Sequence, residues 1–519
     1  MNDKAVKWIA AVALALGLGM RLLLALDHAH FNPLFDDSYY ALDVARSIAA
    51  GKGVTCGGIH TNGFQPLFVL LAVPFYRLFA GHDAAAVHGV LALLAILNTV
   101  AGWLLYGFIR ALKCPRGAVL GLIAWCLSPY VIWHGVNGLE TGLTAVCVFA
   151  SGWYYVARIR AAASWRPLEL AGLGALLGLG VLSRVDMGFW AVALALDMTF
   201  FRREIRVSRR LAGTALVGVV AVVVASPWFL FNMLHFGSPL PTSGAGVRFI
   251  SLAYGYKHWG RGGAYLSGDG VPLKYYALSL RASLREIFTA LDLLSTSLTL
   301  RGMLAALAVA AVVSRRRLAE YAVRYPFLAL FPLLQIVAYS FWIFGQWFYP
   351  RYYYTVAGVA VIWICALADR ALAGTTALRR TAVFAGLGIY LLLLPWDAIP
   401  QKCLRRAFHS RERDADLARA VEDIVPEGVA VGAFQSGALA YYTRDRRIVN
   451  LDGVINRAAL AAMKEKRMTQ YLRGEGIDWL MDWDWIIEAL YARRAGVPDP
   501  MAEWELVKSW GKMGLYRRK

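Results

Sequence analysis

Residues 31–53 read FNPLFDDSYYALDVARSIAAGKG, and they follow the first apolar segment of the chain. Asp36 and Asp37 stand side by side in this stretch. A charged side chain at a bilayer interface costs free energy unless it has a function or a partner, and two like charges repel each other. A helix N-cap at Asp37 or Ser38 would account for one acid only. The pair therefore indicates a catalytic carboxylate at the membrane surface.

The composition around this motif is that of a polytopic membrane protein. Of the 519 residues, 59% are hydrophobic and 17% charged, and the mean hydropathy is +0.50. The net charge of +20 would suit a nucleic-acid-binding protein. However, Lys and Arg cluster in short gaps between apolar segments, where they mark cytoplasmic loops. We therefore expect the lipid bilayer as a partner and no nucleic acid.

The basic gaps also predict the topology. Residues 63–81 (GFQPLFVLLAVPFYRLFAG) are apolar enough to span a membrane, but a span there would place every later basic loop outside. Pro66, Pro74 and Arg77 suit an interfacial helix better. The sequence then predicts about eleven transmembrane helices. Their approximate bounds are 7–26, 84–109, 117–134, 141–157, 168–183, 187–201, 211–231, 290–313, 325–345, 352–369 and 381–398.

Two domains are expected. Residues 1–400 would form the transmembrane domain, with a cytoplasmic amino terminus and an uncleaved first segment. Its first outer loop, about 27–81, would carry two interfacial helices, at 38–50 and 64–79. Residues 401–519 change to a charged composition with alternating strand and helix patterns. They predict a small α/β domain on the extracytoplasmic side.

Polar residues that interrupt apolar context gather on the predicted outer side. Besides the acid pair, these are Tyr39, Tyr40, His60, Asn62, Gln65, Glu140, Arg184, Asp186, Arg248, Lys257, Arg351 and Tyr352. They suit a lipid-linked phosphosugar, whose phosphate lies at the interface, whose tail lies in the bilayer and whose sugar lies outside. Arginine stabilises charge on a leaving phosphate, and an aspartate can accept the proton of an acceptor hydroxyl.

One such base without a carboxylate nucleophile predicts direct displacement with inversion. The second carboxylate would orient the acceptor or the first acid, or hold a divalent cation. The sequence identifies no cofactor, a divalent cation is the one candidate, and metal dependence stays open. The six cysteines show no metal-ligand spacing.

The motifs FDDSYYALDVARSIAAGKGVT and TNGFQPL, followed by NGLET, LSRVD and WFYPRYYY, resemble the bacterial membrane glycosyltransferases of the GT-C superfamily. These include protein O-mannosyltransferases, aminoarabinose transferases and arabinofuranosyltransferases. The resemblance implies a multi-helix bundle, a polyprenyl-phosphate sugar donor and a location in the bacterial inner membrane. The acceptor would be a glycan, a lipid or a protein.

The resemblance also implies roles for individual residues. The catalytic acid falls on Asp36 or Asp37, and Asp36 is favoured because Asp37 is better placed to cap the following helix. Donor phosphate binding falls on Arg184 and Arg351, with Arg248 a weaker candidate. Gln65 stands where relatives often carry His, so this position offers no imidazole.

Three other functions remain open at this point, one of which is a non-catalytic scaffold or sensor built on the outer domain. A transporter or flippase for lipid-linked sugars typically has charged sites near the midplane and internal repeats. Here the polar groups lie at the outer ends of the spans, and no repeat is evident. A glycan polymerase or ligase would use the same donors, and the acid pair in the first loop argues against it.

Overall fold

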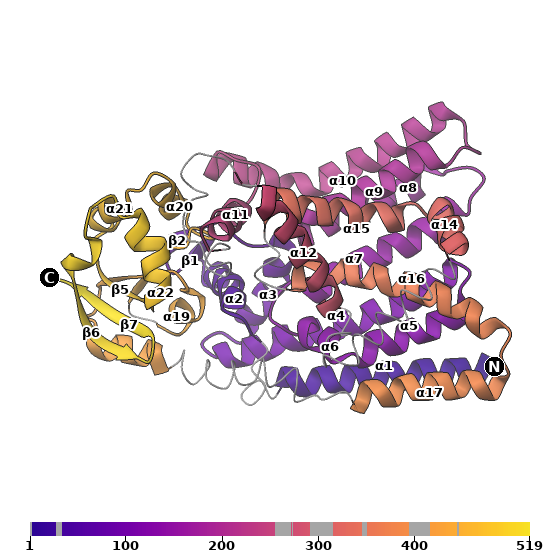
Figure 1. The fold of residues 1–519 in the computed structure, drawn as a ribbon, viewed down its shortest axis with the longest axis horizontal. Helices are drawn as coiled ribbons and strands as arrows, with labels where there is room; N and C mark the ends of the chain where they lie inside the picture. Colours follow the sequence, from indigo (N-terminus) through magenta and orange to yellow (C-terminus); the bar gives the residue numbers. More distant parts are fainter. Residues whose placement is uncertain are drawn as a thin grey trace.

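The computed structural model describes residues 3–26, 34–254, 271, 273–290, 315–344, 350–393, 416–443 and 446–519. A bundle of helices carries an α/β domain at one end, and the amino terminus lies at the opposite end of the bundle (Figure 1). The predicted fold class, a polytopic helical membrane protein with a small carboxy-terminal α/β domain, is confirmed.

The bundle is built from long apolar helices joined by short turns. They are α1 (Asp3–Leu26), α4 (Asp83–Ala111), α5 (Pro115–Leu127), α6 (Pro129–Gly135), α7 (Thr141–Tyr154), α8 (Pro167–Ser183), α9 (Gly188–Leu196), α10 (Val207–Phe236), α15 (Phe327–Ala338), α16 (Tyr354–Ala373) and α17 (Ala377–Leu393). Shorter or more polar helices accompany them: α11 (Thr242–Tyr254), α12 (Leu273–Ala290) and α14 (Arg315–Arg324). Several helices continue into π or 3-10 turns, at Tyr155–Arg160, Val185–Met187, Asp197–Phe201, Tyr339–Ile343 and Pro350–Tyr353.

The helices coincide with the predicted spans wherever the structure describes the chain. Four described helices are long and apolar enough to cross a membrane alone, and two bent pairs bring the number to six. Other predicted spans correspond to shorter apolar helices such as α8. The predicted span at 290–313 lies almost entirely outside the described residues. The count of eleven therefore stays a prediction.

A buried arginine explains how one predicted span is broken. The α5–α6 pair bends by 60°, and Pro129 at the bend cannot donate a backbone hydrogen bond. The guanidinium of Arg21, from α1, donates to the freed carbonyls of Trp125 and Cys126, at 2.9 Å each. Its Nε also donates to Asn98 Oδ1 at 2.7 Å. The bend turns α6 toward the NGLET motif at the end of the bundle.

The predicted first outer loop contains the two helices expected there, α2 (Asp36–Ala49) and α3 (Pro66–Leu78), joined by the short hairpin β1 (Thr55–Cys56) and β2 (Ile59–His60). Both helices lie between the bundle and the α/β domain (Figure 1). At 13 residues, α3 is shorter than the roughly 20 residues that cross a bilayer. Its length suits an interfacial position.

The predicted N-cap at Asp37 or Ser38 is wrong. The cap position of α2 is Phe35, and both acids lie in the first helical turn. The Ser38 hydroxyl accepts the backbone N–H of Phe35 at 3.0 Å, which satisfies the start of the helix. The carboxylate of Asp37 is therefore available for another partner.

The carboxy-terminal domain is a mixed five-stranded sheet with helices. Its strands are β3 (Ala430–Ala433), β4 (Arg447–Asn450), β5 (Ile477–Trp483), β6 (Trp504–Trp510) and β7 (Met513–Arg518), in the order β4-β3-β5-β7-β6. β3 pairs in parallel with β4 and β5, whereas β7 pairs antiparallel with β5 and β6. A helix over residues 416–424 precedes the sheet. It is followed along the chain by α19 (Gly437–Tyr442), α20 (Arg457–Lys464), α21 (Met468–Gly474) and α22 (Asp484–Ile486), and by the turns Ile487–Tyr491, Ala492–Arg494 and Pro500–Glu503.

The three parallel strands direct their carboxyl ends to one edge of the sheet, where ligands and functional loops gather in open α/β sheets. Here that edge meets α2. One hydrophobic core joins the two parts, because Ala438, Tyr441 and Ile455 of the domain pack with buried residues of α2, α3 and α4.

Candidate active site

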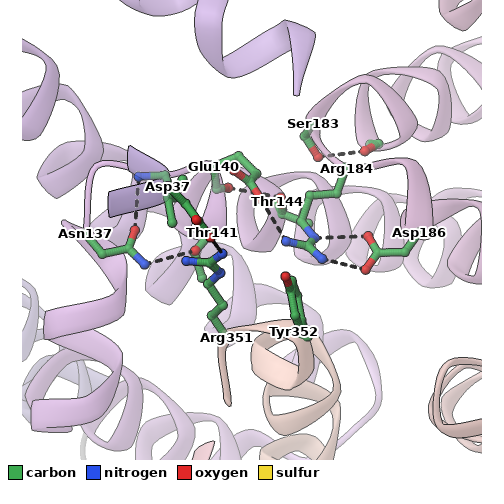
Figure 2. Close-up of polar contacts among 12 residues, drawn as sticks. Asp37, Asn137, Glu140, Thr141, Thr144, Ser183, Arg184, Asp186, Arg351 and Tyr352 are labelled. Atoms are coloured by element: carbon green, nitrogen blue, oxygen red, sulfur yellow. Dashed lines mark hydrogen bonds and ion pairs between the residues drawn. The ribbon is translucent and has the colours of Figure 1, made fainter. Parts of the chain in front are cut away.

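Asp37 and Arg351 form an ion pair between the first outer loop and the turn that precedes α16. The pair joins residues 314 positions apart, and Figure 2 shows the guanidinium directed at the carboxylate. The Asp37 side chain is 35% exposed, whereas that of Arg351 is only 5% exposed. The Arg351 guanidinium also lies over the rings of Phe35 and Tyr352, at 5.7 and 5.4 Å. A buried cation therefore stands beside an accessible carboxylate.

Asp36 points into a different environment. Its carboxylate accepts the backbone N–H groups of Ala438 and Gly437, at 2.8 and 3.2 Å. Burial is the main cause that raises the pKa of Asp36 to about 6, and repulsion from Asp37 adds to it, while the two backbone hydrogen bonds act in the opposite direction. The Asp36 carboxylate is thus held by the α/β domain, whereas that of Asp37 is partly exposed beside Arg351.

Two further carboxylates face the acid pair from the carboxy-terminal domain. Asp482, in β5, accepts two backbone N–H groups at the end of β3, at 2.8 Å each. Burial raises its pKa to about 7, with a contribution from Asp36. Asp452 follows β4 and accepts the N–H of Val454 at 2.7 Å. Burial, then repulsion from Asp37 and Asp36, raises its pKa well above the usual range.

The sequence analysis missed both of these acids. The available signal was their position, within or just after strands whose carboxyl ends share one edge of the sheet. In the described part of the chain, no group of three or more His, Cys, Asp or Glu has a geometry that could hold a metal ion. The divalent cation therefore stays a prediction.

Arg184 lies at the centre of a second charged cluster. It donates to Glu140 at 2.7 Å and to both oxygens of Asp186, at 2.7 and 3.0 Å. The Tyr339 hydroxyl lies 3.2 Å from Arg184 and donates to Asp186 at 2.7 Å. Figure 2 shows the guanidinium held between the two carboxylates. With two anions around one cation, this cluster suits a structural role better than phosphate binding, and Arg351 is the stronger phosphate candidate.

The NGLET turn holds the start of α2 against the bundle. The Ser38 hydroxyl donates to the backbone carbonyl of Asn137 at 2.7 Å. The Asn137 side chain accepts the N–H of Leu139 at 3.1 Å, which closes the turn. Gly138 has φ of +72°, and a Cβ there would collide with Leu34 and Ser38. Only glycine fits this close approach. The turn therefore holds the residues on both sides of the acid pair, Leu34 and Ser38, against the bundle.

Comparisons with known proteins agree with this architecture. Residues 65–231 match the dolichyl-phosphate-mannose-protein mannosyltransferase family, and residues 404–519 match a domain of unknown function, DUF8728. The chain is a glycosyltransferase that resembles the GT-C superfamily, and the family match covers residues 65–231 of it. The resemblance drawn from the motifs is thereby confirmed.

Solved structures share the fold of this transferase over nearly its whole length. ArnT from Cupriavidus metallidurans bound to undecaprenyl phosphate is 14% identical, with a TM-score of 0.54 over 99% of this chain and 98% of that one. The Archaeoglobus fulgidus oligosaccharyltransferase in complex with Zn and sulfate is 12% identical, with a TM-score of 0.56 over 98% and 73%. No curated protein sequence matches the transferase significantly.

Tyr39 and Tyr40, both predicted to bind substrate, contact the carboxy-terminal domain. The Tyr40 hydroxyl accepts the backbone N–H of Ser436 at 3.2 Å and the Asn450 side-chain amide at 3.3 Å. The Tyr39 hydroxyl lies 3.1 Å from that of Tyr442. Both rings are buried. These two tyrosines thus join α2 to the carboxy-terminal domain.

The remaining predicted residues of the first outer loop lie around α3. His60 is exposed on β2. Asn62 is buried, and its Oδ1 accepts the backbone N–H and the hydroxyl of Thr242, at 3.1 and 2.8 Å. Gln65 precedes α3 at its cap position without a side-chain cap hydrogen bond. The contacts of Asn62 are structural, since they join the loop to the start of α11.

Three predicted residues come from later segments. The guanidinium of Arg248, in α11, lies 4.4 Å from the centre of the Trp342 ring. The Tyr352 ring faces both Arg184 and Arg351, at 5.4 Å each, and so lies between the two charged clusters. Figure 2 shows its hydroxyl end close to Arg184. Lys257 lies outside the described residues.

His134 is a candidate that the sequence analysis missed. It lies near the end of α6, with its ring 4.2 Å from that of Tyr130 and 6.1 Å from that of Phe35, the cap residue of α2. Its Nδ1 is buried and has no hydrogen-bond partner among the described residues. The signal was a lone histidine in the apolar run just before NGLET. An imidazole is therefore present near the acid pair, although Gln65 does not supply it.

Proposed function

We propose that the transferase moves a sugar from a polyprenyl-phosphate donor to an acceptor hydroxyl on the extracytoplasmic side, with inversion at the anomeric carbon. The observation that carries this proposal is the Asp37–Arg351 ion pair. In this pair a carboxylate lies beside an arginine at the end of the bundle that bears the α/β domain, which supports Asp37 as the base and Arg351 as the phosphate-binding cation. The relative ArnT, solved with undecaprenyl phosphate, supports a polyprenyl phosphate as the leaving group.

In the proposed reaction, the acceptor oxygen forms a bond to the anomeric carbon as the bond from that carbon to the phosphate oxygen breaks. The polyprenyl phosphate departs with the electron pair, and Arg351 stabilises the charge on its oxygens. Asp37 takes the proton of the acceptor hydroxyl. Since Asp37 already contacts Arg351, a donor phosphate bound to Arg351 would lie close to Asp37. The donor and the acceptor hydroxyl would then be adjacent.

The proposal assigns the chain to the bacterial inner membrane with its amino terminus in the cytoplasm. Residues 1–400 would form the transmembrane catalytic domain and residues 401–519 the extracytoplasmic domain. The acceptor is a glycan, a lipid or a protein. A protein acceptor is supported by a further solved relative, the Archaeoglobus fulgidus oligosaccharyltransferase tethered with an acceptor peptide, at 13% identity and a TM-score of 0.51.

The test is release of polyprenyl phosphate from radiolabelled polyprenyl-phosphate sugars by the purified chain in proteoliposomes, with envelope glycans, lipids and proteins added as acceptors. A general base contributes roughly 10²–10⁴-fold, so Asp37→Asn should slow release by about that factor. Asp478→Asn is a matched control, because Asp478 is an exposed carboxylate paired with Arg518 on the outer domain. Movement of intact donor across the bilayer without release would instead indicate a flippase. Equal rates for Asp37→Asn and the wild type would refute the role of Asp37.

A further inference from the structure

The carboxy-terminal domain touches the transmembrane part through unusually close backbone contacts. Gly63, between β2 and α3, lies against the backbone of Val454 and Ile455. A Cβ added to Gly246, in α11, would lie 2.7 Å from the carbonyl oxygen of Gly453. In α19, a Cβ on Gly437 would collide with the backbone of Asp36. Contacts this close leave no room for a side chain. The domain therefore packs directly against the backbone of the first loop and of α11.

Hydrogen bonds connect the same surfaces and converge on α2. Asp36 accepts two N–H groups of α19, and the Tyr40 hydroxyl accepts from Ser436. Further along α2, the Arg46 guanidinium donates to the Tyr441 carbonyl at 3.0 Å and lies over the ring of the same residue at 4.3 Å. On its other side, α2 is held by the hydrogen bond from Ser38 to the NGLET turn.

The position of Asp36 explains why the domain matters for Asp37. Successive residues of an α-helix point about 100° apart. When Asp36 is fixed on the domain, the direction of the Asp37 side chain is fixed as well, and it meets Arg351.

We propose that the carboxy-terminal domain is part of the transferase site, and that Asp36 is a positioning residue that fixes Asp37 by binding the first backbone N–H groups of α19. This inference rests on the proposed function. It assigns to residues 404–519, which match a domain family of unknown function, the task of holding the catalytic turn. Asp37 alone then takes the proton.

The first experiment separates positioning from catalysis by conservative rescue. Asp36→Asn keeps one oxygen, which can accept the N–H of Ala438, and loses the acceptor of the N–H of Gly437, whereas Asp36→Ala removes both acceptors. We expect Asp36→Asn to keep kcat within about fivefold of wild type and Asp36→Ala to lose more than about tenfold, because removal of a general base alone costs roughly 10²–10⁴-fold. The donor KM should change little in both. If Asp36→Asn is as slow as Asp37→Asn, Asp36 is itself the base and the inference is wrong.

The second experiment pushes the domain away without changing any charge. Gly437→Ala and Gly246→Ala each insert a methyl group into the contact, from opposite sides. Their matched controls are Gly474→Ala, also in a helix of the outer domain, and Gly244→Ala, in α11, because a Cβ at either position meets nothing within 4 Å. We expect the first two variants to lower kcat more than about tenfold, toward the loss expected for a displaced base, and both controls to behave as wild type.

Hydrogen exchange followed by mass spectrometry supplies a readout that needs no activity. Exchange at residues 437–442 should accelerate in Asp36→Ala, Gly437→Ala and Gly246→Ala. It should accelerate less in Asp36→Asn, which keeps one of the two hydrogen bonds, and should stay at the wild-type rate in both controls. Accelerated exchange with unchanged kcat would overturn the inference and leave the proposed function intact. A wild-type protein that releases no polyprenyl phosphate would overturn the proposed function, and exchange would still report whether Asp36 holds α19.

Discussion

Replacement of Arg184 should destabilise the fold rather than simply weaken donor binding. The guanidinium is buried and neutralises two buried carboxylates, Glu140 and Asp186. Removal of one partner from a buried ion pair costs about 3–5 kcal/mol, because the other charge is left uncompensated. Asp186 keeps the hydrogen bond from Tyr339, which offsets part of the loss. We therefore expect Arg184→Ala to lower the free energy of unfolding by about 3 kcal/mol, at the lower end of that range.

The measurement is thermal unfolding of the purified protein in detergent, followed by tryptophan fluorescence. Arg203→Ala is the control, because Arg203 is exposed. Adding Glu140→Gln and Asp186→Asn to Arg184→Ala should recover part of the stability, since neutral amides cost less to bury than unpaired carboxylates. If Arg184→Ala unfolds at the wild-type temperature while its donor KM rises about tenfold or more, as loss of a charge-assisted contact would cause, then Arg184 binds the donor phosphate and the structural interpretation is wrong.

The remaining predictions address the donor, the pH dependence and the topology. Arg351→Ala should lower the rate at limiting donor by roughly ten- to a hundredfold, since a charge-assisted contact contributes about 1.5–3 kcal/mol. Arg351→Lys should recover this rate only partly, because lysine lacks the planar fork of the guanidinium. Full activity of the Ala variant at limiting donor would contradict this. Burial raises the pKa of Asp36 from 3.8 to about 6, so the folded state holds this proton more tightly than the unfolded state. The free energy of unfolding should therefore fall as the pH rises through that window, by up to about 3 kcal/mol, and thermal unfolding of Asp36→Asn should lack this component; identical slopes would contradict the prediction. Cysteines at His82, Arg116 and Arg166 should be labelled from outside only at position 82, measured in a Cys403→Ser background because the other five native cysteines are buried; outside labelling at 116 would mean that residues 63–81 cross the membrane.

Local sequence patterns identified those features that depend on neighbouring residues. Long apolar runs predict membrane helices because a helix satisfies its own backbone hydrogen bonds in lipid. Charged groups cost free energy at a bilayer interface. The acid pair after the first apolar run and the arginine in the WFYPRYYY motif were therefore identified as candidate functional groups. Local patterns also misled, because the cap of α2 turned out to be Phe35, with Ser38 as its partner. Asp37 and Ser38 both looked able to cap the helix, and only the backbone geometry shows that neither does.

The sequence by itself thus determined the helical membrane fold, the α/β character of the last domain and the residue types of the site. Only the tertiary structure decided which charge meets which. Arg184 and Arg351 look alike as arginines beside outer-side motifs, yet one is held by Glu140 and Asp186 and the other meets Asp37. Asp36 and its neighbour differ because α19, about 400 residues away, binds one of them. Such pairings depend on how helices and strands pack, and no local pattern records a contact between segments that lie far apart in the chain.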